Sequence, residues 1–276
     1  MNAHKLLEDR VDDDRAHTVL NLKVAHPARM YDYYLGGKDN YAADRSAAEE
    51  ALAVAPELRA IARANRAFLQ RAVTYLVKSG IRQFVDIGAG LPTQRNVHQV
   101  AQEIAPDARV VYVDNDPIVL AHARALLSNS DKGWIRVVQA GVEHPQRLLA
   151  DPQLRAVIDF TQPMAILLVS VLQFVPTSDP ESIVRPLRDA MVPGSYLVVS
   201  HPTQDFRRTA VLRVADTYHR AKAPAVPRTR GEIQALFGDF ELVEPGLVQA
   251  PLWRPVGPVS SDLDTIWMYA GVGCKP

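Results

Sequence analysis

Cysteine is almost missing from this chain of 276 residues, since Cys274 is the single example. One cysteine cannot form a disulfide within the chain, and it cannot supply a cysteine cluster for zinc. The lack of a disulfide framework is typical of a reducing compartment, so we expect a cytoplasmic location. No pair of histidines or acids has a metal-ligand spacing, and we therefore expect no metal.

A surplus of charge is missing too, because 31 Lys and Arg residues face 31 Asp and Glu residues. Nucleic-acid binding through phosphates needs an excess of basic side chains, so this balance argues against such a partner. Long apolar runs are also lacking, since the longest, 164–172, is half of the roughly 18 residues that a spanning helix needs. The polar, acidic start of the chain is unlike a signal peptide. We therefore expect a globular protein without a membrane partner.

The chain divides into three stretches by composition. Residues 1–26 begin with clustered acids and are predicted to form a flexible tail. Residues 27–80 show helical spacing of apolar side chains, which predicts a helical extension. From 81 to 276, short β-branched runs alternate with helical segments. This alternation is typical of an α/β domain in which helices cover both faces of a mostly parallel sheet.

The α/β stretch contains recognisable connections. Apolar residues between the first two predicted strands, from Val97 to Ile104, repeat at i, i+3, i+4 and i+7, so that connection is a helix and the unit is βαβ. Asp116 followed by Pro117 predicts the start of the next helix, with Asp116 as its N-cap. The predicted strands are 82–87, 109–113, 135–139, 165–169, 196–200, 241–248 and 265–272.

A glycine loop follows the first predicted strand, in the run Asp86-Ile87-Gly88-Ala89-Gly90. Glycine allows a sharp turn there and lets a ligand lie against bare backbone. The second predicted strand ends in Asp114, where an acid binds the ribose hydroxyls in doubly wound folds. Together the two features predict an adenosine-containing ligand at the carboxyl end of the sheet.

The residues around this loop bear on which nucleotide binds. A dinucleotide fingerprint has a third glycine where this chain has Thr93. Asp86 would also repel a pyrophosphate, by roughly 1 kcal/mol or more at a partly screened site. S-adenosylmethionine instead carries an ammonium and a sulfonium, which a carboxylate favours. The loop therefore fits S-adenosylmethionine better than NAD, and no Gly-Lys-Ser/Thr run is present for a P-loop.

Several long motifs run in order along the chain. They are YDYYLGGKDNYAAD (31–44), NRAFLQRAV (65–73), RQFVDIGAGLPTQ (82–94), VVYVDNDPIVLAHARALL (110–127), PMAILLVSVLQFVP (163–176), PGSYLVVSH (193–201) and WRP (253–255). Over about 27–272 the chain thereby resembles a family of bacterial S-adenosyl methyltransferases. The resemblance implies a Rossmann-like methyltransferase fold, with seven strands of which the last is antiparallel, preceded by a helical extension. It implies S-adenosylmethionine as cofactor, with S-adenosylhomocysteine as product, and leaves the methyl acceptor open.

Two positions depart from the family pattern. Gly141 stands where the family usually has an acid that contacts the adenine amino group, and a backbone carbonyl or Glu143 could replace that contact. Gln173 stands where the family commonly has a histidine. The loss of both the acid and the histidine would fit a degenerate site. A non-catalytic protein that binds S-adenosylmethionine is therefore one alternative, and an NAD-dependent oxidoreductase is another.

The expected site contains cofactor-binding residues and no assigned catalytic residue. Methyl transfer from a sulfonium is an in-line displacement with an excellent leaving group, so a dedicated base is optional. Residues of the glycine loop would hold the methionine end, and Asp114 the ribose. Arg59, Arg63 and Arg66 form a basic stripe at i, i+4 and i+7, which is either a solvated helix face or places Arg66 to bind the methionine carboxylate. Ser170 would lie under the reacting end. The predicted cofactor-binding residues are Tyr34, Arg66, Asp86, Gly88, Ala89, Gly90, Asp114, Asn115, Ala140, Gly141, Val142 and Ser170. Of these, Asn115 would flank the adenine and 140–142 would form its far wall.

Three further features allow both a functional and a structural interpretation. Four tyrosines, Tyr34 among them, lie around Gly36 and Gly37, either as a hinged lid over the ligand or as a packed helical cap. His201 follows the fifth predicted strand, either as a base or as a buried structural histidine. We expect a small-molecule methyl acceptor. Residues 205–230 hold seven Lys or Arg and two Asp, which indicates either an acidic or phosphorylated acceptor or a solvated helix. The sequence does not give the oligomeric state.

Overall fold

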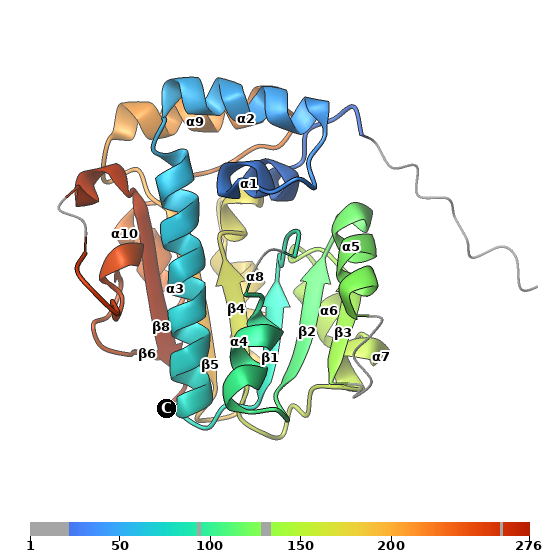
Figure 1. Cartoon of the computed structure of the whole chain (residues 1–276). Helices are drawn as coiled ribbons and strands as arrows, with labels where there is room; N and C mark the ends of the chain where they lie inside the picture. The colour runs from blue at the N-terminus through green and yellow to red at the C-terminus, as the bar shows by residue number, and fades with distance from the viewer. Residues whose placement is uncertain (1–21, 93–94, 128–133, 260–261) are drawn as a thin grey trace, which may run out of the picture.

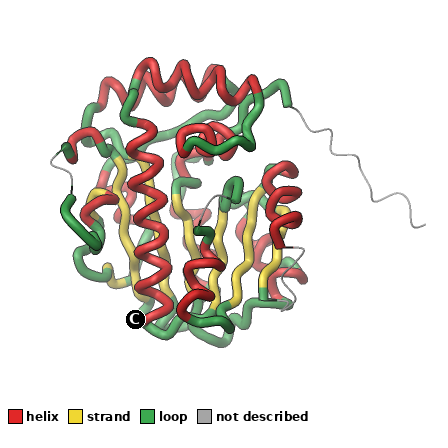
Figure 2. Tube along the Cα trace, in the orientation of Figure 1, coloured by secondary structure: helices red, strands yellow, loops and turns green. Residues whose placement is uncertain are grey.

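One mixed sheet with helices on both faces forms the body of the molecule (Figures 1 and 2). The computed structural model describes residues 22–92, 95–127, 134–259 and 262–276. Most of the predicted acidic tail lies outside these residues. Thr93, which stands in place of the third glycine of a dinucleotide fingerprint, also lies outside them. Residues 22–26 of the predicted tail are described, and they lead into the first helix.

The helical extension consists of α1 (Pro27–Leu35), α2 (Ala42–Val54) and α3 (Leu58–Lys78). Gly36 ends α1 with a φ of +82°, a conformation that glycine adopts without a Cβ penalty. The predicted apolar stripe of α3 is buried, including Phe68 and Leu76 at 0% exposure. Because α3 packs across one face of the sheet (Figure 1), the extension is part of the same core as the sheet.

The sheet has the strand order β3-β2-β1-β4-β5-β8-β6, with β7 also paired to β8. Strands β1 to β5 are mutually parallel, and β8 runs antiparallel to β5. The strands are β1 (Gln83–Ile87), β2 (Arg109–Asp114), β3 (Ile135–Gln139), β4 (Ala165–Val169), β5 (Tyr196–Pro202), β6 (Glu241–Leu242), β7 (Val248–Gln249) and β8 (Met268–Cys274). This is the fold class expected from the sequence.

The closing strands differ from the prediction. The segment 241–248 forms two short strands rather than one, so the sheet has eight strands instead of seven. Pro245 lacks the N–H that a continuous ladder needs, and Gly246 has a φ of +86°, so the chain turns between β6 and β7. The last strand begins at Met268 rather than at 265, because Leu263–Thr265 forms a 3₁₀ turn.

Side chains of the buried strands alternate between two apolar cores, as the period of a strand requires. On β1, Phe84 packs in the core shared with α3, whereas Val85 and Ile87 pack in the opposite core. The first face carries α3, α4 (Val97–Ile104) and α5 (Pro117–Leu127), with α1, α2 and α9 (Arg208–Arg220) at its upper end. The second face carries α6 (Pro145–Leu149), α7 (Pro152–Arg155), α8 (Glu181–Asp189) and α10 (Arg230–Ala235).

The strand order reverses beside β1, because β2 lies on one side of it and β4 on the other. The carboxyl ends of these strands point toward α1 in Figure 1. In open α/β sheets, ligands bind outside the carboxyl ends at such a switch point. The fold therefore places the glycine loop and the ends of β2 and β4 beneath the helical extension.

Candidate cofactor site

A cavity of about 390 Å³ opens at the carboxyl ends of the strands. This size lies within the range of roughly 300–1,000 Å³ that is common for ligand pockets. Every predicted cofactor-binding residue except Tyr34 lines it, namely Arg66, Asp86, Gly88, Ala89, Gly90, Asp114, Asn115, Ala140, Gly141, Val142 and Ser170. Residues that are far apart in the sequence thus meet around one space.

The glycine loop needs both of its glycines. Gly88 and Gly90 have φ values of +72° and +66°, in the left-handed region that side chains rarely adopt. A Cβ on Gly88 would also overlap the Val171 side chain. The amides of Gly88 and Ala89 donate to the carbonyl of Val113, at 2.8 and 3.2 Å, which fixes the loop against β2.

Two buried carboxylates face the cavity from neighbouring strands. Asp86 on β1 is 5% exposed and Asp114 on β2 is 6% exposed. Burial raises the pKa of Asp86 to about 7, with Arg66 opposing the shift and Asp114 adding to it. Burial also raises the pKa of Asp114, while hydrogen bonds from the amides of Asp116 and Gly90 oppose the shift. A buried acid pair of this kind favours a cationic ligand group.

Arg66 brings a guanidinium from α3 to the same cavity. Its Nη2 donates to Asn96 Oδ1 at 2.9 Å, which orients the group. Its Nε is buried and has no hydrogen-bond partner among the described residues. The neighbouring positions of the basic stripe point elsewhere, since Arg59 pairs with Glu49 and Arg63 is exposed. Arg66 is therefore the stripe residue that can bind a ligand carboxylate.

Glu143 takes the space above Gly141. A Cβ added at Gly141 would overlap the Glu143 carboxylate, and both residues line the cavity. The side chain of Glu143 thus lies where an acid at position 141 would project. The departure from the family pattern at Gly141 leaves a carboxylate at this end of the cavity.

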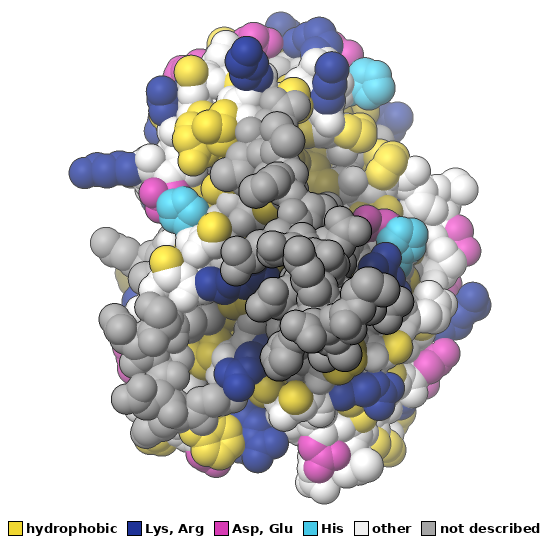
Figure 3. All heavy atoms as spheres, turned by 90° about the vertical axis from the view of Figure 1, so that its right-hand side faces the viewer, with side chains coloured by type: hydrophobic (Ala, Val, Ile, Leu, Met, Phe, Trp, Pro, Cys, Tyr) yellow, Lys and Arg dark blue, Asp and Glu magenta, His cyan; other side chains and the backbone are white. Residues whose placement is uncertain are grey.

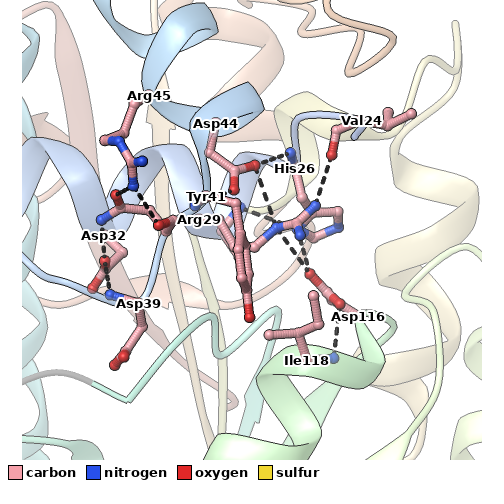
Figure 4. A network of polar contacts seen from close by, with 12 residues as sticks. Val24, His26, Arg29, Asp32, Asp39, Tyr41, Asp44, Arg45, Asp116 and Ile118 are labelled. Carbon is pink, nitrogen blue, oxygen red and sulfur yellow. Dashed lines mark hydrogen bonds and ion pairs between the residues drawn. The ribbon is translucent and has the colours of Figure 1, made fainter. Parts of the chain in front are cut away.

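A polar network holds the helical extension over the site (Figure 4). Arg29 on α1 lies 3.3 Å from Asp44 on α2 and 3.7 Å from Asp116, measured from its Nε. His26 Nδ1 lies 3.1 Å from Asp116, and the His26 amide donates to Asp44 at 2.9 Å. Asp116 also accepts a hydrogen bond from the Ile118 amide at 2.9 Å, at the start of α5. The predicted N-cap residue therefore also joins the extension to the loop after β2, through its contact with Arg29.

The sequence did not single out all lining residues. Residues 24–28 line the cavity, although 24–26 belong to the predicted tail. The sequence signal for order there was His26 followed by Pro27, because a proline is favoured in the first turn of a helix and His26 is the N-cap of α1. Asn65 also lines it, 2% exposed, and accepts from Ser200 Oγ at 2.6 Å while donating to Tyr31 Oη at 3.0 Å. Asn65 could have been found in the sequence, because it is a polar residue on the apolar face of a predicted helix, and buried polar groups need hydrogen-bond partners.

Tyr34 lies outside the cofactor cavity. It lines a smaller neighbouring cavity, and its hydroxyl accepts from Tyr218 Oη at 3.0 Å. Tyr31 donates from its hydroxyl to the carbonyl of Ala62 at 3.0 Å, and Tyr33 donates to Glu49. These bonds anchor the tyrosine-rich segment to other helices as a cap, and hinged motion of that segment stays a prediction.

His201 has a structural environment. It is fully buried, with Nδ1 2.8 Å from the carbonyl of Pro202 and Nε2 2.6 Å from Arg228. Burial and the Arg228 charge lower its pKa to about 3. It does not line the cofactor cavity. A histidine that is neutral and bonded at both nitrogens is a poor candidate for a base.

The basic residues of 205–230 are mostly engaged within the fold. Arg207 lies 2.8 Å from Glu57, Arg220 pairs with Asp216, and Arg228 donates to backbone carbonyls such as that of Leu172. Lys222 lines the cofactor cavity. On the face shown in Figure 3, Lys and Arg side chains are dispersed among acidic and apolar ones.

The helices of the described residues include none that is long and apolar enough to cross a membrane. Within the same ranges, no three His, Cys, Asp or Glu side chains come together as a metal-ligand set.

The sheet order and the glycine loop at its switch point are those of an S-adenosylmethionine-dependent methyltransferase, and the comparisons with known proteins show this class. A sequence profile described as S-adenosyl methyltransferase matches residues 13–276, and the chain belongs to this family. A proposed methyltransferase from Thermobifida fusca is 43% identical, with a TM-score of 0.87 over 93% of this chain and 97% of its own. A DUF574-family protein from Streptomyces avermitilis is 41% identical, with a TM-score of 0.89 over 93% of this chain and 100% of its own. No curated protein matches the chain significantly.

Proposed function

We propose that this methyltransferase transfers a methyl group in line to a small-molecule acceptor. The observation that carries the proposal is the cavity at the switch point, which is lined by two buried carboxylates and by Arg66, whose Nε has no hydrogen-bond partner among the described residues. When bound, S-adenosylmethionine would supply an electrophilic methyl group on its sulfonium. An acceptor lone pair would form a bond to that carbon as the S–CH₃ bond breaks, with S-adenosylhomocysteine as the leaving group. The single cysteine supports a cytoplasmic location as part of the same proposal.

The residues present fit each part of this cofactor. Asp86 favours the ammonium, and Arg66 can donate from its free Nε to the methionine carboxylate. Each carboxylate oxygen of Asp114 accepts one hydrogen bond from a backbone amide and keeps a lone pair for the ribose hydroxyls. Asn115 and Glu143 flank the place of the adenine, and residues 140–142 form the wall behind it.

Ser170 would lie beneath the reacting end. It follows β4 with a φ of +55°, a strained conformation for a side chain that is often kept where function requires it. Its amide donates to the carbonyl of Ser200 at 3.0 Å, which holds the turn at the rim of the cavity. Positioning by such fixed residues, rather than proton transfer, would supply most of the acceleration.

Calorimetric titration with S-adenosylhomocysteine, with NAD as the control, tests the cofactor. Binding of S-adenosylhomocysteine with a dissociation constant on the order of micromolar, and no heat from NAD, is the expected result. Binding of NAD alone would instead support an oxidoreductase. Cofactor binding without methyl transfer to any member of a broad acceptor panel would support a regulatory protein.

A further inference from the structure

A second cavity lies beside the cofactor site, under α1 and between α3 and α9. Its volume is about 80 Å³. It shares Pro27, Tyr31, Ser170 and Phe174 with the wall of the cofactor cavity. A group bound in the second cavity would therefore lie next to Ser170, at the place proposed for the reacting end.

The lining of this cavity is aromatic and apolar. No Lys, Arg, His, Asp or Glu belongs to it among the described residues. Phe174 and Tyr218 contribute rings whose centroids lie 5.8 Å apart, and Trp267 adds a third ring. The Tyr31 hydroxyl donates to the carbonyl of Ala62, so its proton is already used. Such walls favour a flat, uncharged group and disfavour an ionised one, because no charged side chain of the lining compensates its loss of hydration.

Gln173 lines the cavity and carries a buried hydrogen-bond acceptor that has no partner among the described residues. Its side chain is 4% exposed, and its Nε2 donates to Ser170 Oγ at 2.8 Å. Its Oε1 is buried and has no hydrogen-bond partner among the described residues. Its backbone carbonyl accepts from Val226 at 2.8 Å, which fixes the residue in place. A buried acceptor without a partner is costly, and a ligand O–H or N–H would relieve that cost.

We propose that this cavity holds the methyl acceptor, and that the acceptor presents a small uncharged aromatic ring with an O–H or N–H donor to Gln173 Oε1. The inference rests on the proposed function, and it names the substrate class. The cavity volume of about 80 Å³ is smaller than the roughly 150 Å³ of a cavity that encloses benzene. A single ring therefore enters edge first, and the rest of the acceptor extends into the cofactor cavity. Gln173 is a positioning residue, because an amide does not take up a proton at neutral pH.

The test uses phenol, anisole and benzoate as probes of the full chain. Each is titrated by NMR into the protein alone and into protein saturated with S-adenosylhomocysteine. Phenol is expected to bind at least about fivefold more tightly than anisole, which lacks the donor, and than benzoate, which is charged. Anisole or benzoate binding as tightly as phenol, or no phenol binding, would overturn the assignment.

Variants then locate the binding. In Gln173→Leu the preference for phenol over anisole should fall to within about twofold, because the acceptor oxygen is gone. Ala215→Leu narrows the cavity and should weaken phenol at least about tenfold. Ala210→Leu is its matched control, since Ala210 is a half-buried alanine on the same helix that lines neither cavity, and phenol affinity should not change.

The titration of S-adenosylhomocysteine separates the two proposals. If it binds the wild-type protein while phenol shows no preference, the acceptor assignment fails and the methyltransferase proposal stands. If it does not bind at all, the proposed function fails, whatever the phenol titration gives. Equal loss of phenol binding in Ala210→Leu and Ala215→Leu would also count against the second cavity.

Discussion

Asp114 combines two tasks in one side chain. Its Oδ2 accepts from the Gly90 amide at 2.9 Å and its Oδ1 accepts from the Asp116 amide at 2.9 Å, so it braces both loops of the cofactor site. The remaining lone pairs can accept from the ribose, in charge-assisted bonds worth about 1.5–3 kcal/mol each. We expect Asp114→Ala to weaken S-adenosylhomocysteine binding at least about tenfold by calorimetry. Unchanged affinity would refute the ribose assignment.

We expect Asp86 to make cofactor binding sensitive to pH. Its pKa of about 7 in the free protein means that it is largely protonated in mildly acidic solution. The ligand ammonium favours the carboxylate, so binding below the pKa requires loss of a proton. The affinity for S-adenosylhomocysteine should fall by up to about tenfold for each pH unit below 7. Asp86→Asn should bind weakly at every pH, and a sloping profile in that variant would contradict the assignment.

The same residue affects stability in the opposite direction. The folded-state pKa of Asp86 is raised from 3.8 to about 7, so the folded protein holds this proton more tightly than the unfolded chain. Its contribution therefore lowers the free energy of unfolding as the pH rises from 3.8 to about 7, by at most about 1.4 kcal/mol per unit. Asp86→Asn should accordingly raise the unfolding free energy near pH 8, measured in urea. A variant less stable than the wild-type protein at that pH would be the contrary result.

At the scale of elements, the extension is held by a buried ion cluster rather than by surface pairs. Arg29 is 4% exposed, and its loss would leave the buried carboxylate of Asp44 without its counter-charge. We expect Arg29→Met to lower the free energy of unfolding by about 3 kcal/mol. The control is Arg59→Met, which removes a solvent-exposed pair with Glu49 and should cost less than about 1 kcal/mol. Equal effects in denaturant titrations would show that the cluster does not hold the extension.

The sequence predicted those elements whose apolar pattern reports their packing. The five parallel strands are confirmed because each is a short, mostly apolar run, and the α3 stripe is confirmed because its helical spacing is unbroken. The prediction of one strand over 241–248 was wrong, because Pro245 and Gly246 interrupt the apolar residues and turn the chain. The contact of Arg29 with Asp116 could not be predicted, because ion pairs between distant elements leave no periodic signal. Glu143 was named as a substitute for the acid at 141 from its proximity in sequence alone.

At the scale of the whole molecule, the cofactor cavity joins the helical extension to the sheet. Tyr31 and Arg66 line it from the extension, while Asp86 and Asp114 line it from the sheet. Phe68 and Phe84 belong to one apolar core, so the segments 27–80 and 81–276 should unfold together despite their different compositions.

A ligand that contacts both segments should stabilise them as a unit. S-adenosylhomocysteine at about 100 times its dissociation constant adds about 2.7 kcal/mol. For a chain of this size each kcal/mol raises the Tm by about 2–4 °C, so we expect a shift of about 5–10 °C. Differential scanning calorimetry should show one transition, with and without the ligand. Two transitions, of which the ligand moves only one, would mean that the extension is a separate domain and that the site belongs to the sheet alone.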